Sequence, residues 1–149
     1  MDLTLNLELN SRESTNLHLM TNSQNAVNVL LVEDTEDNRM MMRRLLELSG
    51  YQVSEAVNGL EAVNLAERET PNIILMDLSL PIVDGLAATR RIRELPNLAT
   101  VPIIAVSAHD TADFHAEALA AGCDAYITKP VDYTELEDLI SDLTARHSY

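Results

Sequence analysis

The chain has 149 residues, of which 46% are apolar and 23% charged, the size and composition of one ordinary globular domain with its own core. A formal charge of −14 argues against nonspecific binding to nucleic acid or to an anionic membrane, and it favours cations or a partner with a basic surface. The single cysteine, Cys123, excludes an internal disulfide framework, and no apolar run approaches the roughly 20 residues that cross a bilayer.

Residues 1–26 are rich in asparagine, serine and threonine and contain no aromatic residue, which predicts a flexible tail before a folded domain over residues 27–147. The alternative is a strand that pairs with a sheet edge or another chain, because alternate residues are leucine: Leu3, Leu5, Leu7 and Leu9. The segment lacks the basic-then-apolar pattern of a secretory signal. We therefore expect a cytoplasmic, stand-alone domain without an attached output or catalytic domain.

From Val27 onward, short apolar runs alternate with helical patterns. The runs predict strands over 28–33, 51–55, 73–77, 101–106 and 125–128. Helices are predicted over 36–49, 59–69, 86–94, 110–121 and 132–146. The first helix is expected to bury one stripe, formed by Met41, Met42, Leu45 and Leu48. Five such repeats predict an α/β fold, a flavodoxin-like, doubly wound parallel sheet with strand order 2-1-3-4-5.

Five polar side chains follow the carboxyl ends of these strands, where α/β sheets place their sites. They are Glu33, Asp34, Asp77, Ser107 and Lys129. The set brings three carboxylates, a hydroxyl and an ammonium to one edge of the sheet. Lys129 is the only lysine beside nine arginines, which suits a point charge, although a surface lysine in an arginine-rich chain is an equal alternative.

Three neighbouring carboxylates repel one another, and a bound cation relieves that repulsion. An oxygen-only set suits Mg²⁺, whereas nothing in the chain resembles a calcium loop. A carboxylate can also attack phosphorus, and the transfer then needs a metal, an ammonium and a hydroxyl or N–H group on the phosphoryl oxygens. The predicted edge supplies all three. Helix capping is the alternative role of Asp34, but it leaves Asp77 and Lys129 unexplained.

Residues 27–147 resemble the receiver domain of two-component response regulators. The resemblance rests on four motifs, in order: Val29-Leu-Leu-Val-Glu33-Asp34 with Asn38 beyond, Met76-Asp77-Leu-Ser-Leu-Pro81-Ile-Val-Asp84-Gly85, Ala105-Val-Ser107-Ala108 and Thr128-Lys129-Pro130. It implies that Asp77 accepts a phosphoryl group and that the chain signals rather than turns over a substrate. Its only implied chemistry is Mg²⁺-dependent self-phosphorylation and self-dephosphorylation.

The same resemblance assigns roles to the neighbours of Asp77. Asp34, Asp77 and the backbone carbonyl of Ser79 are implied to bind Mg²⁺ directly, and Glu33 to act largely through a metal-bound water. Ser107 is implied to hydrogen-bond the phosphoryl group and Lys129 to neutralise it. No organic cofactor is implied.

Further residues at matching positions concern switching. Tyr126 stands at the switch position, where the family's aromatic ring turns inward as Ser107 moves to the phosphate, and a half-buried strand tyrosine is the alternative. The Lys129-Pro130 bond resembles one that is usually cis. Ser79 and His109 resemble positions that control dephosphorylation, although a solvated loop histidine is the more ordinary role for His109.

The resemblance also implies the partners. The phosphoryl donor is a phosphohistidine on a sensor kinase or a histidine phosphotransfer protein, and the docking surface includes the first helix with Arg39, Met40 and Arg43. A solvated face is the alternative. The acidic final helix makes nucleic acid an unsuitable partner. The output is binding of a downstream protein or onward transfer of the phosphoryl group, and phosphorylation-dependent homodimers remain open.

Three other functions are alternatives to signalling by a phosphorylated receiver domain. A haloacid-dehalogenase-like phosphatase also uses an aspartyl nucleophile, Mg²⁺ and a lysine, but Ser79 stands where its second aspartate belongs. A receiver-like module that binds partners without being phosphorylated would not need the intact acidic set. A flavodoxin would need a phosphate-cradling loop and aromatic rings to sandwich a flavin.

Overall fold

The computed structural model describes residues 26–146. The expected N-terminal tail, with its alternating leucines, lies outside the described residues except for Ala26. The strands are β1 (Asn28–Val32), β2 (Gln52–Ala56), β3 (Ile73–Asp77), β4 (Ile103–Ser107) and β5 (Ala125–Thr128). The helices are α2 (Glu36–Leu48), α3 (Gly59–Glu69), α4 (Gly85–Glu94), α5 (Ala112–Ala121), α6 (Tyr133–Arg146) and a single 3₁₀ turn, η1 (Pro96–Leu98).

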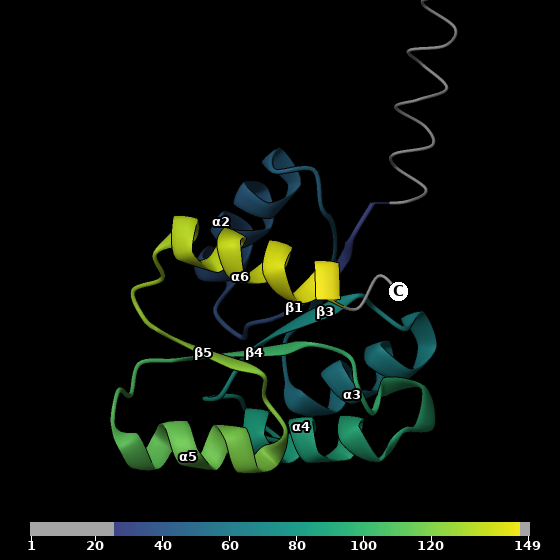
Figure 1. Ribbon diagram of the computed structural model, residues 1–149, viewed down its shortest axis with the longest axis vertical. Helices are drawn as coiled ribbons and strands as arrows, with labels where there is room; N and C mark the ends of the chain where they lie inside the picture. Colours follow the sequence, from purple (N-terminus) through teal and green to yellow (C-terminus); the bar gives the residue numbers. More distant parts are fainter. Residues whose placement is uncertain (1–25, 147–149) are drawn as a thin grey trace, which may run out of the picture.

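All strand pairs are parallel, in the order β2-β1-β3-β4-β5, which confirms the predicted flavodoxin-like topology. Helices α2 and α6 lie on one face of the sheet, and α3, α4 and α5 lie on the other (Figure 1). The order reverses at β1, because the chain goes to β2 on one side and to β3 on the other. The carboxyl ends of β1 and β3 therefore flank the crevice where such sheets bind ligands.

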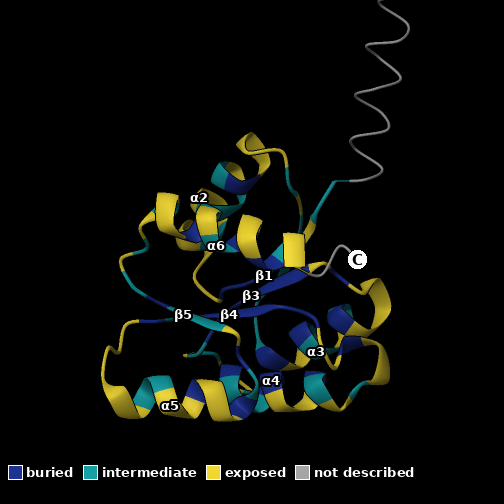
Figure 2. Cartoon of the chain, in the orientation of Figure 1, coloured by how far each residue is buried: buried dark blue, intermediate teal, exposed yellow. Residues whose placement is uncertain are grey.

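The strands β1, β3 and β4 are buried between two apolar layers, and the edge strands β2 and β5 are mostly half-buried (Figure 2). Alternate residues of β1 enter different layers, with Leu30 and Val32 on the side of α3, α4 and α5 and Val29 and Leu31 on the side of α2 and α6. Four helices carry side-chain caps on their first turns, from Asn58, Asp84, Thr111 and Asp132. Among the described residues, no helix has the length and apolar run that crossing a membrane requires.

Helix α2 differs from the prediction in the face that it buries. Met41 and Leu48 of the expected stripe are 59% and 77% exposed, and the fully buried residue is Leu46. Arg39 and Arg43 both form ion pairs with Glu55 of β2, so the face of the helix that carries them is turned toward that strand. The predicted stripe was therefore wrong for Met41 and Leu48, whereas Met42 and Leu45 are half-buried as expected. The helix itself was predicted within one residue.

Two smaller differences concern other elements. Strand β4 begins two residues later than predicted because Pro102 has no N–H group to donate, although its carbonyl accepts from the backbone of Ile74. Helix α5 begins at Ala112 rather than near residue 110, since Thr111 caps it by accepting from the N–H of Phe114. The turn η1 was not predicted.

Candidate functional site

Three carboxylates meet at the carboxyl edge of the two central strands. One oxygen from each of Glu33, Asp34 and Asp77 lies within 4.8 Å of the others. Asp77 ends β3 and Glu33 follows β1, so the pairing of Val32 with Met76 carries the two acids to neighbouring positions. Glu33 and Asp77 are only 7% and 2% exposed, whereas Asp34 is exposed. The cluster thus has a buried floor and an exposed carboxylate at its mouth.

Lys129 enters this cluster from the loop after β5. Its Nζ lies 3.0 Å from Asp77 Oδ2 and 3.3 Å from Glu33 Oε1. The Lys129-Pro130 peptide bond is cis, as expected. Burial by itself would lower the pKa of the ammonium, but the hydrogen bond and charge of Asp77 and the charge of Glu33 outweigh it and raise that pKa. Lys129 is therefore a fixed cation bonded to both buried acids.

Backbone N–H groups hold the other oxygens of the same two acids. The amide of Ser79 donates to Asp77 Oδ1 at 2.9 Å, and the amide of Thr35 donates to Glu33 Oε2 at 3.1 Å. Gly85 lets α4 pass under this loop, because a Cβ there would lie 2.2 Å from the Asp77 carbonyl oxygen. Each buried carboxylate is thus fixed from two sides, by Lys129 and by a local amide.

Ser107 and Tyr126 lie on the next two strands and connect to the cluster through the main chain. The backbone amide of Lys129 donates to the Ser107 carbonyl at 2.7 Å. Ser107 Oγ, which is buried, accepts from the amide of His109 at 3.1 Å, and Tyr126 Oη donates to the carbonyl of the same histidine at 2.5 Å. His109 therefore joins the hydroxyl of Ser107 to the phenol of Tyr126.

Aromatic and charged neighbours hold the outer part of this loop. The Tyr126 ring stacks on His115 with centroids 3.9 Å apart, and the His109 ring stacks on Phe114 at 4.3 Å. His115 Nε2 also lies 2.9 Å from an oxygen of Asp110. Both the His115 and Asp110 side chains are more than two-fifths exposed, at 42% and 66%, so water reaches these contacts.

Comparison with known proteins decides the family. The family model of the response regulator receiver domain matches residues 29–141. The chain belongs to this family. The polar-differentiation response regulator DivK of Brucella anthropi is 42% identical over 103 residues, which cover 69% of this chain and 84% of DivK.

Solved receiver structures agree with the fold. The receiver domain of the sensor histidine kinase PA1611 from Pseudomonas aeruginosa PAO1 is 37% identical, with a TM-score of 0.76 over 80% of this chain and 98% of that one. That receiver domain has a magnesium ion coordinated in its active-site cleft. The Francisella response regulator 1452 receiver domain, 28% identical, superposes with a TM-score of 0.77 over 82% of this chain and 99% of that chain. Membership of the receiver family sets aside the phosphatase and flavodoxin alternatives.

The acidic cluster of this receiver domain is compatible with Mg²⁺. Mg²⁺ binds oxygen ligands at about 2.1 Å, so opposite ligands of an octahedron lie roughly 4.2 Å apart, close to the 4.8 Å limit of the three carboxylate oxygens. Three ionised carboxylates and one ammonium leave two negative charges, which a divalent cation balances. Waters and a carbonyl can complete the shell, since Mg²⁺ keeps several waters.

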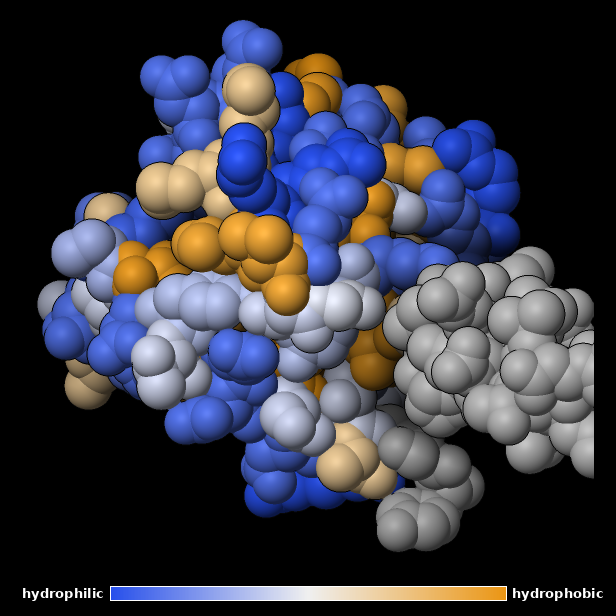
Figure 3. All heavy atoms as spheres, turned by 90° about the horizontal axis from the view of Figure 1, so that it is seen from above, coloured by the Kyte–Doolittle hydropathy of each residue, from blue (hydrophilic) through white to orange (hydrophobic). Residues whose placement is uncertain are grey.

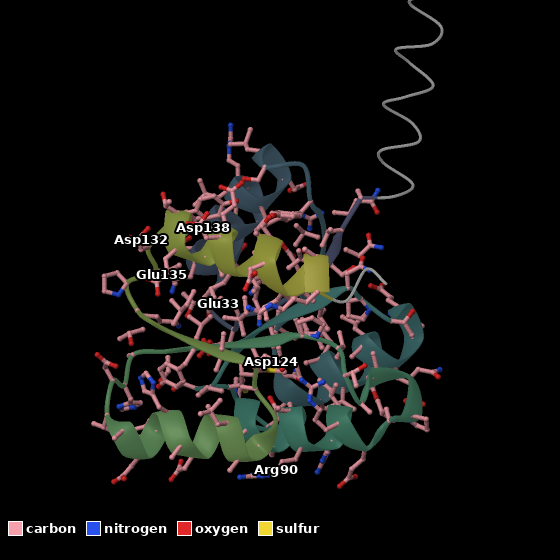
Figure 4. All side chains as sticks on the ribbon, viewed as in Figure 1. Glu33, Arg90, Asp124, Asp132, Glu135 and Asp138 are labelled. Carbon is pink, nitrogen blue, oxygen red and sulfur yellow. The ribbon has the colours of Figure 1, made fainter. Side chains whose placement is uncertain are left out.

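An apolar cavity of about 500 Å³ adjoins the acidic cluster. Side chains of α2 and α6, among them Met42, Leu45 and Leu136, line its apolar part, and Asp77 and Lys129 line its polar end. Figure 3 looks down on the α2 and α6 side, where apolar patches interrupt a hydrophilic surface. Asp132, Glu135 and Asp138 are labelled at the start of α6, so this end of the helix is acidic (Figure 4).

Arg39 is the site residue that the sequence did not assign to the cluster. It was expected on the partner-binding surface of the first helix, yet only 15% of its side chain is exposed. Its Nη1 donates to the Glu33 carbonyl at 3.1 Å and reaches the Asp34 carbonyl at 3.5 Å. No motif signals such a contact, because main-chain carbonyls are present at every position of the chain. Met40 remains 59% exposed on the same helix.

Proposed function

We propose that Asp77 accepts a phosphoryl group from a phosphohistidine of a sensor kinase or a histidine phosphotransfer protein, in a Mg²⁺-dependent reaction. This reversible modification is the signal that the receiver domain carries. Its output is phosphorylation-dependent binding of a downstream protein, and onward phosphoryl transfer and phosphorylation-dependent homodimers are the alternatives. Membership of a signalling family supports the proposal.

The observation that carries it is the position of Asp77. Its carboxylate is buried at 2% exposure, receives Lys129 on one oxygen and the Ser79 amide on the other, and adjoins two further acids. A purely structural acid would need only its bonded partners. The two additional carboxylates add repulsion that a bound cation relieves. The arrangement therefore suits phosphoryl transfer, in which charge neutralisation and positioning dominate.

In the proposed step an oxygen of Asp77 bonds to phosphorus, and the bond from phosphorus to the donor's imidazole nitrogen breaks with its electron pair leaving on that nitrogen. Lys129 lies close enough to act as a counter-ion for a phosphoryl oxygen. Glu33, Asp34, Asp77 and the Ser79 carbonyl would hold Mg²⁺, which supplies further charge neutralisation when bound. Attack by water on the acyl phosphate releases inorganic phosphate and restores the carboxylate.

Ser107 and Tyr126 are proposed to carry the signal away from Asp77. Ser107 Oγ accepts from His109, so its own proton can be donated to a phosphoryl oxygen. Movement of the hydroxyl toward that oxygen stretches its bond to the His109 amide, and the His109 carbonyl is the acceptor for Tyr126. Phosphorylation would thus shift the rotamer population of Tyr126 through one residue. Ser79 and His109, both exposed at the rim, are proposed to influence the attack by water.

The direct test uses the purified chain with Mg²⁺ and acetyl phosphate, a small donor of the same group. Intact-mass spectrometry should show an increase of one phosphoryl group, which excess EDTA prevents. Asp77→Asn should remove the increase because it replaces the proposed nucleophile. The matched control is Asp113→Asn, an exposed acid in the first turn of α5, which should be modified like the wild type.

An increase that survives Asp77→Asn would contradict the assignment of the acceptor. No increase in the wild type with Mg²⁺ would contradict the proposed function and favour the alternative of a receiver-like module that binds partners without being phosphorylated.

A further inference from the structure

The contacts of Arg39 link the edge of the sheet to the loop that carries two of the three clustered acids. Arg39 lies in the first turn of α2, and its Nη1 donates to the Glu33 carbonyl at 3.1 Å. The same nitrogen lies 3.5 Å from the Asp34 carbonyl. Strand β1 ends at Val32, so both carbonyls lie beyond the last residue of the strand. Arg39 therefore provides them with a donor that the sheet no longer supplies.

The guanidinium is itself held in place. Its Nε faces Glu55 Oε2 of β2 at 3.6 Å, and Arg43 Nη1 approaches the other oxygen of Glu55 at 3.2 Å. Arg43 also pairs with Glu47 at 3.0 Å, and these two acids raise the pKa of Arg43. Glu55 thus anchors two arginines from α2, of which Arg39 bonds the loop after β1.

The loop between β1 and α2 aims two carboxylates from consecutive residues. Glu33 turns inward to Lys129 and to the Thr35 amide, while Asp34 is exposed at the mouth. A rotation of the peptide between them would move both carboxylates relative to Asp77. Because Arg39 bonds the carbonyl of that peptide and reaches the carbonyl of the next one, it opposes the movement.

We propose that Arg39 is a positioning residue of the metal site, which fixes the loop so that the Glu33 and Asp34 carboxylates converge with Asp77 on one cation. The inference rests on the proposed Mg²⁺-dependent function. A simple charge argument predicts the opposite effect on Mg²⁺ affinity: a guanidinium near the site repels Mg²⁺, so its removal would strengthen Mg²⁺ binding. If Arg39 positions the loop, its removal should instead weaken Mg²⁺ binding. Arg39→Lys separates the charge effect from the positioning effect, because it keeps the positive charge but loses the planar set of donors.

The test measures Mg²⁺ binding to the unphosphorylated protein by calorimetry or by NMR shifts, for the wild type, Arg39→Lys and Arg39→Gln. Both variants should weaken Mg²⁺ binding roughly tenfold, because loss of a residue that orients metal ligands lowers the metal affinity of a site by about this factor or more. Arg43→Gln is the matched control, since Arg43 shares Glu55 but pairs with Glu47 rather than with the loop, and it should bind Mg²⁺ like the wild type.

Glu55→Gln provides a second variant that leaves Arg39 in place but removes its anchor, and it should weaken binding by a smaller factor, about twofold. Tighter or unchanged Mg²⁺ binding in both Arg39 variants, while the wild type binds Mg²⁺ and is phosphorylated, would overturn the inference alone. Equal weakening in Arg43→Gln would also overturn it, since the effect would then belong to the helix surface. A wild type that binds no Mg²⁺ would overturn both the inference and the proposed function.

Discussion

The two sides of the site are held in different ways. On the side of β1 and β3, Glu33 and Asp77 are buried, and each is fixed by Lys129 and by a backbone amide. On the side of β4 and β5, Ser107 is buried, but the contacts beyond it run through an exposed loop to Tyr126. We propose that the first side, the fixed side, supplies the groups that bind a metal and a phosphoryl group, and that the second, the mobile side, supplies groups that move on phosphorylation.

In the proposed function, this difference separates chemistry from signalling within a few residues. Groups that stabilise a transferring phosphoryl group act best when they are fixed before the reaction. A switch needs two arrangements of similar free energy, which exposed hydrogen bonds and ring contacts allow. Main-chain contacts lead from one side to the other, from the Lys129 amide to Ser107 and through the His109 backbone to Tyr126. Variants on the fixed side should therefore change the chemistry, and variants on the mobile side should change its transmission.

The largest effect is expected from Lys129→Met on the fixed side. Loss of the ammonium leaves Asp77 and Glu33 without their shared cation, and the rate of phosphorylation by acetyl phosphate should fall about 100-fold. Mg²⁺ should bind more tightly than in the wild type, because the competing positive charge is gone. The rate is measured by intact-mass spectrometry over time at saturating Mg²⁺.

Arg146→Ala is the control for Lys129→Met, because Arg146 forms an exposed pair with Asp142 within α6, away from the acidic cluster.

The pKa of Lys129 is raised above the ordinary lysine value of 10.5. The stability that its charge contributes is therefore fully present below pH 10.5 and is lost as pH rises through the raised pKa. The stability difference between Lys129→Met and the wild type should therefore be constant from about pH 7 to about pH 9. A rate like that of the wild type in Lys129→Met would contradict the fixed-side interpretation.

A smaller and more local effect is expected from Tyr126→Phe on the mobile side. The variant loses the hydrogen bond to the His109 carbonyl, which at an exposed position should cost on the order of 0.5–1 kcal/mol of unfolding free energy. Hydrogen exchange at the His109 amide should quicken about threefold as the loop loosens. The amides of Thr35 and Ser79 should keep their rates, since they belong to the fixed side.

Tyr133→Phe serves as the matched variant for this measurement. Its hydroxyl bonds the Leu45 carbonyl at 2.9 Å and Ser49 Oγ at 2.6 Å, so its loss should loosen the end of α2 instead. Equal changes at the Thr35 and His109 amides in Tyr126→Phe would mean that the two sides form one unit.

The strands, their order and the gathering of polar residues at one edge could all be predicted from the sequence. Short strand-like runs, separated by helical patterns, allow few topologies once crossovers must be right-handed. The same topology brings strand-end residues together, which is why Asp77 and Lys129, far apart in the chain, could be expected to meet. Their assigned roles in metal binding and phosphorylation stay predictions.

Other features could not be predicted because they depend on how one element rotates against another. Helix α2 is oriented so that Leu46 is buried and Arg39 and Arg43 pair with Glu55 of β2. In the same orientation, Arg39 reaches the carbonyls of Glu33 and Asp34. The link from Ser107 to Tyr126 is similar, since it runs through backbone atoms of His109. Neither contact depends on a pattern of residue types that a sequence displays.

The central claim is that Asp77 carries the phosphoryl group, rather than Glu33 or Asp34 beside it. Borohydride reduction of the phosphorylated protein tests it most directly, because an acyl phosphate is reduced to an alcohol that peptide mass spectrometry can locate. We expect the alcohol at Asp77 alone, and only after treatment with both Mg²⁺ and acetyl phosphate. An alcohol at Glu33 or Asp34, or none in a protein shown to carry a phosphoryl group, would contradict the claim.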